Sequence, residues 1–338
     1  MNKQLQKVLN SGIWGTVGPK SESAAAMLAK RLSADFGLLV HSASAALEVQ
    51  LRALEIAYGD EVIVASYSNP INAMAAANVG ASVVFADIDK QNLALSPAFA
   101  KAVLTSKTKA IIVDALCSDL SYMQKLAAFC DKNDVKVILN LGDAFDARPM
   151  IPYAYTTVID LSDGCIISAG EGAALIHNNK NAFESAFAIH NCGRPPGAEA
   201  SINMDAILGG NYRITEWQAA AVEAGIEQLD ELMAARKQKA NAVTEELTSD
   251  FLVPVASLPA VIIKYDKSKN GGVHIEVMVD KLRSKGYNAC RPWLAMHAQP
   301  FFSSDYYRKM TGCDRSYDKY DMKNSIAAEN ELIWIKLN

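Results

Sequence analysis

Short apolar runs alternate with helical segments along the first 141 residues of the chain. A strand buried on both faces reads as a continuous apolar run, and strands separated by helices form βα units around a parallel sheet. This rhythm predicts an α/β fold whose large domain is built on a mainly parallel sheet. The runs expected to be strands are residues 61–66, 81–89, 109–116 and 135–141.

The pattern changes after residue 155. Three short apolar runs with tight glycine turns, at 156–162, 164–169 and 172–177, predict consecutive strands. A long helix is expected from residue 214 to about 236 or 247, and a strand–helix–strand rhythm then predicts a small C-terminal α+β domain. We place the boundary along the long helix, which gives a large domain of residues 1–235 and a small domain of residues 236–338.

Composition excludes several classes of function. The net charge of −4 does not favour nucleic acid or an anionic membrane as a partner. The apolar runs are too short to span a bilayer, and the N-terminus has no apolar signal-peptide core. The six cysteines show neither metal-site spacing nor a disulfide framework, so no metal is expected. A cytoplasmic protein is the simplest interpretation.

Six segments, in order and at similar spacing across nearly the whole chain, resemble the DegT/DnrJ/StrS family of nucleotide-sugar aminotransferases, which use pyridoxal phosphate (PLP). The resemblance implies a type I PLP-transferase fold, a homodimer and an active site at the dimer interface. A weaker echo lies at 291–302. The six segments are SASAALEVQLRAL (42–54), GDEVIVASYS (59–68), VGASVVFADID (79–89), GEGAALI (170–176), HNCGRP (190–195) and NYRITEWQAAA (211–221).

Four positions depart from the family's pattern. Cys165 stands five residues before Gly-Glu-Gly, where the family has its Schiff-base lysine, and Asn140 stands where a carboxylate pairs with the pyridine nitrogen. Asn69 replaces the aromatic residue that stacks on the ring, and Asp160 replaces a serine that binds the phosphate. An uncharged amide forms no ion pair, and a carboxylate repels a phosphate. The resemblance with these changes predicts no catalytic residue and no bound PLP.

Other positions keep the family's residue types. Ser42 and Ser44 open a helix directly after a strand, which suits either an anion site or plain helix caps. Asn211 and Arg213 match the family's Asn-Tyr-Arg, whose asparagine reaches the phosphate in the neighbouring subunit, although they also suit simple packing at a dimer interface. His297 lies in the segment that resembles the edge of the family's substrate site.

Two further features have both a functional and a structural interpretation. Asp143 and Glu171 lie on segments expected around the cofactor pocket, where they would bind a ligand or be solvated loop carboxylates. Cys165 would be a nucleophile only with a basic neighbour to ionise its thiol, and none is evident in the sequence. A small residue filling a buried strand is the alternative.

The leading prediction is a catalytically degenerate, sugar-aminotransferase-like protein in nucleotide-sugar or surface-polysaccharide biosynthesis. It would be the non-catalytic half of a heterodimer with an active paralogue, or a PLP-independent homodimer that binds a nucleotide sugar. The alternative is an active sugar aminotransferase, with Lys136 or Lys180 as a displaced lysine, or a dehydratase with an unusual active site. The family's dehydratase branch carries histidine at the lysine position, whereas this chain has Cys165. A purely structural role is the third option.

Overall fold

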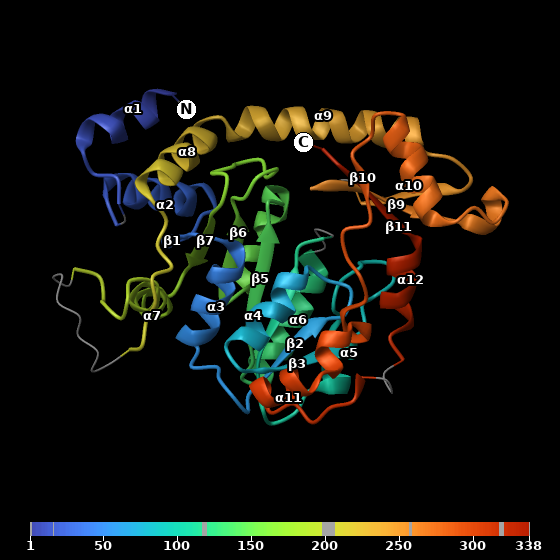
Figure 1. Cartoon of the computed structure of the whole chain (residues 1–338), viewed down its shortest axis with the longest axis horizontal. Helices are drawn as coiled ribbons and strands as arrows, with labels where there is room; N and C mark the ends of the chain where they lie inside the picture. The colour runs from blue at the N-terminus through green and yellow to red at the C-terminus, as the bar shows by residue number, and fades with distance from the viewer. Residues whose placement is uncertain are drawn as a thin grey trace.

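The computed structural model describes residues 2–15, 17–116, 120–197, 207–256, 259–317 and 321–337, arranged around two sheets (Figure 1). The strands are β1 (Phe36–Val40), β2 (Glu61–Ala65), β3 (Ser82–Ala86), β4 (Thr108–Asp114), β5 (Lys136–Gly142), β6 (Thr156–Asp160), β7 (Ala173–His177), β8 (Leu252–Ala256), β9 (Ala260–Tyr265), β10 (Ala289–Cys290) and β11 (Leu332–Lys336). The α-helices are α1 (Asn2–Ser11), α2 (Pro19–Arg31), α3 (Ala43–Ala53), α4 (Pro70–Asn78), α5 (Pro97–Val103), α6 (Leu120–Lys132), α7 (Lys180–His190), α8 (Glu216–Glu227), α9 (Leu229–Leu247), α10 (Ile275–Ser284), α11 (Asp305–Thr311) and α12 (Lys323–Glu331).

The large sheet has seven strands in the order β1-β7-β6-β5-β4-β2-β3. Strands β3, β2, β4, β5 and β6 pair in parallel, whereas β7 is antiparallel to both of its neighbours, β6 and β1. Strand β1 therefore runs in the same direction as the parallel strands. The carboxyl ends of β1 to β6 all meet at one edge of the sheet, which is called the carboxyl edge below.

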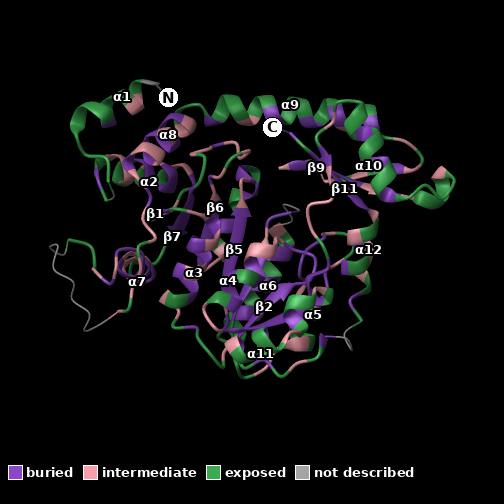
Figure 2. Ribbon diagram, viewed as in Figure 1, coloured by how far each residue is buried: buried purple, intermediate pink, exposed green. Residues whose placement is uncertain are grey.

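Alternate side chains of each strand enter separate cores on the two faces of this sheet. In β2, Ile63 and Ala65 join one core, while Val62 and Val64 join the other, and all four side chains are buried. Figure 2 shows the same pattern as a buried centre between largely exposed outer helix faces. Burial on both faces explains the continuous apolar runs, and it confirms the prediction of a mainly parallel α/β domain.

The second sheet is antiparallel, with the order β10-β11-β9-β8. Helices α9 and α10 pack against it through a separate apolar core that includes Val261, Ile263 and Ile333. The small C-terminal α+β domain is thus confirmed. Helix α9 runs along the top of the molecule in Figure 1, from the large domain to the small one.

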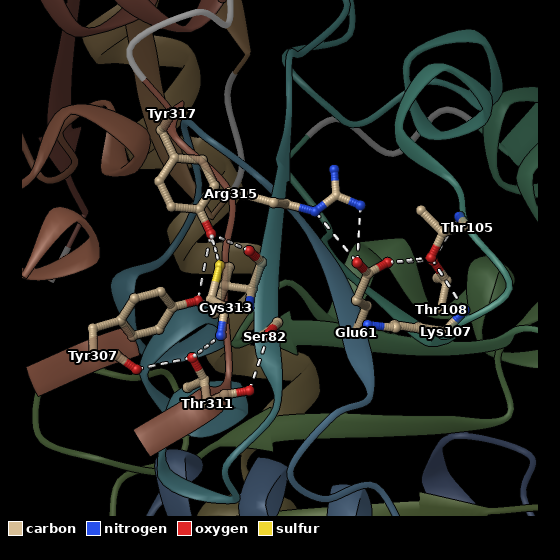
Figure 3. A network of polar contacts seen from close by, with 11 residues as sticks. Glu61, Ser82, Thr105, Lys107, Thr108, Tyr307, Thr311, Cys313, Arg315 and Tyr317 are labelled. Carbon is tan, nitrogen blue, oxygen red and sulfur yellow. Dashed lines mark hydrogen bonds and ion pairs between the residues drawn. The ribbon is translucent and has the colours of Figure 1, made fainter. Parts of the chain in front are cut away.

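The chain between β10 and β11 returns to the large sheet. Tyr307 and Tyr317 are buried in the large-domain core, where Tyr317 donates to the carbonyl of Val83 and the N–H of Val83 donates to Tyr307 Oη at 2.8 Å. Arg315 pairs with the buried carboxylate of Glu61 at 2.9 Å (Figure 3). Residues 307–317 thus pack at the amino ends of β2 and β3, so they belong in space to the large domain although they lie beyond residue 235. The boundary near residue 235 stays a prediction.

Two sequence-based expectations about secondary structure were wrong. Residues 164–169 form no strand, because the segment between β6 and β7 closes on itself through bonds from Ala169 N to Leu161 O (2.8 Å) and from Asp163 N to Gly170 O (2.9 Å). The expected long helix is two helices, with a break at Gln228, whose φ of −107° and ψ of 1° are not helical. Within the described ranges, no helix combines the length and apolarity needed to cross a membrane.

Candidate functional site

Chain direction brings most of the sequence-predicted site residues to the carboxyl edge. At this edge, each of five strands either ends at or near a polar residue or is followed by one within a few positions. Because neighbouring parallel strands end together, these side chains line one rim of the sheet, where ligands bind in open α/β sheets. The five are Ser42 after β1, Asn69 after β2, Asp114 at the end of β4, Asn140 in β5 and Asp160 at the end of β6.

The start of α3 offers donors at this edge. Ser42 is the N-cap, and its Oγ accepts from the N–H of Ala45 at 3.2 Å while lying 3.2 Å from Ser44 Oγ. Both serines are half-buried. The first N–H groups of a helix have no acceptor within the helix, so this end can hold an anion. The same bonds also describe an ordinary helix cap.

Two buried asparagine side chains link β5, α4 and β4 at this edge through hydrogen bonds. Asn140 Nδ2 donates to Asn72 Oδ1 at 2.8 Å, and Asn72 Nδ2 donates to both oxygens of Asp114 at 3.0 Å. The backbone N–H of Asn69 donates to Asp114 Oδ2 at 3.1 Å. Burial raises the pKa of Asp114 to about 7, against the lowering effect of the bonds from Asn72 and Asn69. Sequence reasoning missed Asn72 and Asp114, because neither occupies a motif position.

Asn69 and Asp160 are both engaged locally. The Asn69 side chain caps α4 by accepting from the N–H of Ile71 at 3.2 Å. Asp160 is half-buried, and its Oδ1 accepts from the N–H of Ser162 at 3.0 Å. The Asp160 carboxylate is therefore directed toward its own loop.

Cys165 lies half-buried on the loop between β6 and β7. Burial raises the pKa of its thiol, and the nearby carboxylates of Asp160 and Asp143 raise it further. Its sulfur lies 3.8 Å from Ser162 Oγ. The thiol stays protonated near neutral pH, so the structure supports no nucleophilic role for Cys165.

Asp143 ties this loop to α9. Its Oδ2 accepts from the N–H of Ile166 at 3.1 Å and from Arg236 Nη2 at 2.5 Å, and both charged side chains are largely buried. A groove of about 310 Å³ opens beside them, lined by residues 164–166 and by Leu232, Ala235, Arg236, Lys239 and Leu337. Asp143 is therefore a structural partner of Arg236, which the sequence did not reveal.

The two lysines considered as displaced Schiff-base residues lie at the other edge of the sheet. Lys136 starts β5 and pairs with Asp134 at 2.9 Å. Lys180 follows the end of β7, at the amino edge, and pairs with Glu184 at 3.5 Å. In contrast, Lys239 on α9 lines the same groove as Cys165. The sequence did not predict that Lys239 lies near Cys165, because the two residues are far apart along the chain.

The remaining predicted residues have different surroundings. Asn211 is exposed, and its Oδ1 accepts from Arg213 Nε at 2.9 Å. Glu171 is exposed. His297 is buried at 2.6 Å from Ser66 Oγ, and burial lowers the pKa of its imidazole. Their ligand-binding and interface roles stay predictions.

This fold defines a class of protein: a large, mostly parallel α/β sheet with a small antiparallel domain, as in the PLP-dependent aminotransferases. The family model of the DegT/DnrJ/EryC1/StrS aminotransferase family matches residues 1–332. The chain therefore belongs to this family, as the motifs predicted.

Curated relatives and solved structures support this family assignment. A putative L-glutamine:3-amino-2,3-dideoxy-scyllo-inosose aminotransferase from Streptoalloteichus tenebrarius is 28% identical over 301 residues, which are 84% of this chain and 72% of that protein. The crystal structure of 3-amino-5-hydroxybenzoic acid synthase superposes with a TM-score of 0.86 at 24% identity, covering 99% of this chain and 90% of the other. The family and these relatives make the chain a sugar aminotransferase-like protein.

The expectation that no cofactor is bound was wrong. A solved GDP-4-keto-6-deoxymannose-3-dehydratase, with a TM-score of 0.79, 17% identity and coverage of 99% of this chain and 92% of its own, holds a trapped PLP-glutamate geminal diamine. Together with the family match, such neighbours point to PLP. Four altered positions were too narrow a basis for excluding a cofactor that is held by many contacts.

Features of the carboxyl edge fit a small phosphorylated ring. The N-terminus of α3 with Ser42 and Ser44 suits a phosphate. A Cβ atom at Gly142, two residues after Asn140, would meet no atom within 4 Å, so there is open space beside Gly142. Ser68 Oγ, just beyond β2, is buried and has no hydrogen-bond partner among the described residues. A thiol forms no imine with an aldehyde, so Cys165 cannot form a Schiff base.

Among the residues that the structure describes, no cluster of three or more histidine, cysteine, aspartate or glutamate side chains is arranged to hold a metal ion.

Proposed function

We propose that this chain is a PLP-binding enzyme of the sugar aminotransferase family, acting on a keto or amino group of a sugar or cyclitol, and that residue 165 contributes no Schiff base. The observation that carries the proposal is the convergence of Ser42, Ser44 and Asn140 at one edge of a fold whose family uses PLP. The cyclitol aminotransferases among its relatives favour a polyhydroxylated ring as substrate.

The roles of the chain's own residues follow from their contacts. The serines and free N–H groups at the start of α3 would hold the phosphate, and Asn140 would contact the ring nitrogen. The chemistry that PLP supplies when bound is electron withdrawal from the substrate carbon. Asp143 fixes the 164–166 loop through Ile166 N and Arg236, which keeps the wall of the adjoining groove in place.

The test uses the purified full-length chain with PLP. Equilibrium dialysis measures binding, and borohydride reduction followed by peptide mapping locates any lysine adduct. Saturable binding without an adduct supports the proposal as stated. An adduct at Lys239, which shares a groove with Cys165, supports an enzyme with a displaced lysine. Absence of saturable binding at millimolar PLP would refute the proposal.

Activity provides the second readout. The assay offers glutamine or glutamate as amino donor and a keto-cyclitol or a nucleotide-linked keto sugar as acceptor, with product detected by mass spectrometry. Asn140→Ala is the matched variant, because it removes the contact to the ring nitrogen. Transfer by the wild-type chain that falls at least tenfold in this variant is the expected result.

A second candidate function is supported by Cys165 and Asn211. A chain without a lysine on the β6–β7 loop can still lend an exposed asparagine to the site of an active paralogue in a heterodimer. Co-expression with such a paralogue would then give a stable complex, and Asn211→Ala would lower the activity of the paralogue without dissociating the complex. Activity in the chain alone would refute this candidate.

A further inference from the structure

The amide chain at the carboxyl edge has a fixed direction. An ionised carboxylate only accepts hydrogen bonds, so Asp114 obliges Asn72 to present its Nδ2 group, which it does at 3.0 Å to each oxygen. The Oδ1 atom of Asn72 then faces Asn140 and accepts from its Nδ2 group at 2.8 Å. Neither amide can be reversed without setting two donors or two acceptors against each other.

The consequence falls on Asn140. One N–H of its amide is donated to Asn72, which fixes the orientation of the amide and so the position of its Oδ1. That oxygen accepts from the N–H of Gly142 at 3.2 Å, and a carbonyl oxygen has a second lone pair. A Cβ on Gly142, whose N–H this oxygen accepts, would meet nothing within 4 Å, so the space beside Gly142 is open.

We propose that Asp114 is a positioning residue, which acts through Asn72 to hold the Asn140 amide in one orientation, so that its Oδ1 is fixed as an acceptor and favours a ligand ring that carries an N–H donor. This inference rests on the proposed function, in which that ring is the protonated pyridine of PLP. The Asp114 carboxylate on β4 thus acts on the ring nitrogen indirectly, through Asn72 on α4 and Asn140 on β5.

The alternative is an amide ladder that only joins β4, β5 and the start of α4. A ladder of this kind predicts loss of stability when it is cut, but no discrimination between ligands. The two explanations therefore differ in a binding ratio, which a merely structural role does not change.

Two probes make that ratio measurable. PLP can donate a hydrogen bond from its ring nitrogen, whereas N1-methyl-PLP keeps a positive charge on the ring and has no proton to donate. Dissociation constants for both are measured by equilibrium dialysis at pH 8, where Asp114 is ionised. A hydrogen bond that involves a charged group strengthens binding by about tenfold or more. The wild-type chain should therefore bind PLP roughly tenfold or more tightly than the methylated probe.

The variants are Asp114→Asn and Asn72→Ala, with Asp146→Asn as the control on an exposed carboxylate of the segment after β5. Asp114→Asn lets the chain of amides run in either direction, and Asn72→Ala interrupts it. In both, the preference for PLP should fall below about threefold, because about tenfold corresponds to one charged hydrogen bond. The control should keep the wild-type ratio. Near-ultraviolet circular dichroism confirms folding.

The outcomes separate this inference from the proposed function. Saturable PLP binding with equal affinity for the methylated probe in the wild-type chain overturns the inference and leaves the proposed function intact. A wild-type preference that persists in folded Asp114→Asn or Asn72→Ala also overturns it. Should the variants fail to fold, the wild-type ratio decides alone. Absence of PLP binding overturns both.

Discussion

Replacing Asp114 by asparagine should change how the stability of the protein depends on pH. Burial raises the pKa of this carboxyl from an ordinary 3.8 to about 7. Between these two values the unfolded chain has released the proton while the folded chain still holds it. Because the folded state binds more protons, the free energy of unfolding falls as pH rises through this window. The asparagine side chain does not titrate, so the variant loses this contribution.

The magnitude follows from the two pKa values. Each pKa unit corresponds to about 1.36 kcal/mol, so a rise from 3.8 to about 7 gives about 4 kcal/mol over the whole window as an upper value. The stability of Asp114→Asn relative to the wild-type chain should therefore increase by up to about 4 kcal/mol between pH 4 and pH 7, and should level off above that. At pH 4 the comparison reports only the altered hydrogen bonds to Asn72 and Asn69.

Urea unfolding followed by tryptophan fluorescence measures this difference at half-unit steps from pH 4 to pH 8. Asp134→Asn is the matched control, because the bond from Lys136 lowers the pKa of that exposed carboxyl. Its difference from the wild-type chain should stay flat above pH 4. A flat profile for Asp114→Asn as well, or a difference that decreases with pH, would show that Asp114 is an ordinary carboxylate and would refute the reasoning.

Other substitutions test the contacts that hold the site in place, and urea unfolding checks each one. Asp143→Ala leaves the Arg236 guanidinium buried without its partner and should cost about 3–5 kcal/mol, whereas replacing both by apolar residues of similar size should recover most of that loss. Glu61→Ala removes the acceptor shared by Arg315 and two threonines (Figure 3) and should cost about 3 kcal/mol. Ile63→Val, in the centre of β2, should cost about 0.5–1.5 kcal/mol, and a cost near zero would contradict its tight packing.

The sequence predicted the large sheet because strands that are buried on both faces have continuous apolar sequences. Residues 61–66 and 135–141 are mainly apolar runs, and they form the interior strands β2 and β5. The small domain was also predictable from its strand–helix–strand rhythm. In contrast, the run at 164–169 includes Ile167, which is buried in the core against Gly225 of α8 without pairing as a strand, and periodicity cannot separate these two cases.

The site was only partly predictable, for a physical reason. Motif positions such as Asn69, Asn140 and Cys165 can be found by their spacing from recognisable segments, so their places at the carboxyl edge followed from the resemblance. Asn72 and Asp114 belong to no motif, and their partnership appears only when α4 and β4 are brought together. A sequence shows where a residue differs from the family's pattern, but it does not show which residues lie next to that position in the folded chain.

This distinction explains why the expectation about the cofactor failed. The reasoning treated each altered position as a lost contact, as though a cofactor were held by independent groups. In the folded chain, the altered Asn140 belongs to a network that ends on Asp114, so the carboxyl group absent from β5 is present on the neighbouring strand. Charge acts over several ångströms in a partly buried site, and hydrogen-bonded amides transmit an orientation as well as a direct contact does. The electrostatic character of such a site is therefore a property of the strand edge as a whole.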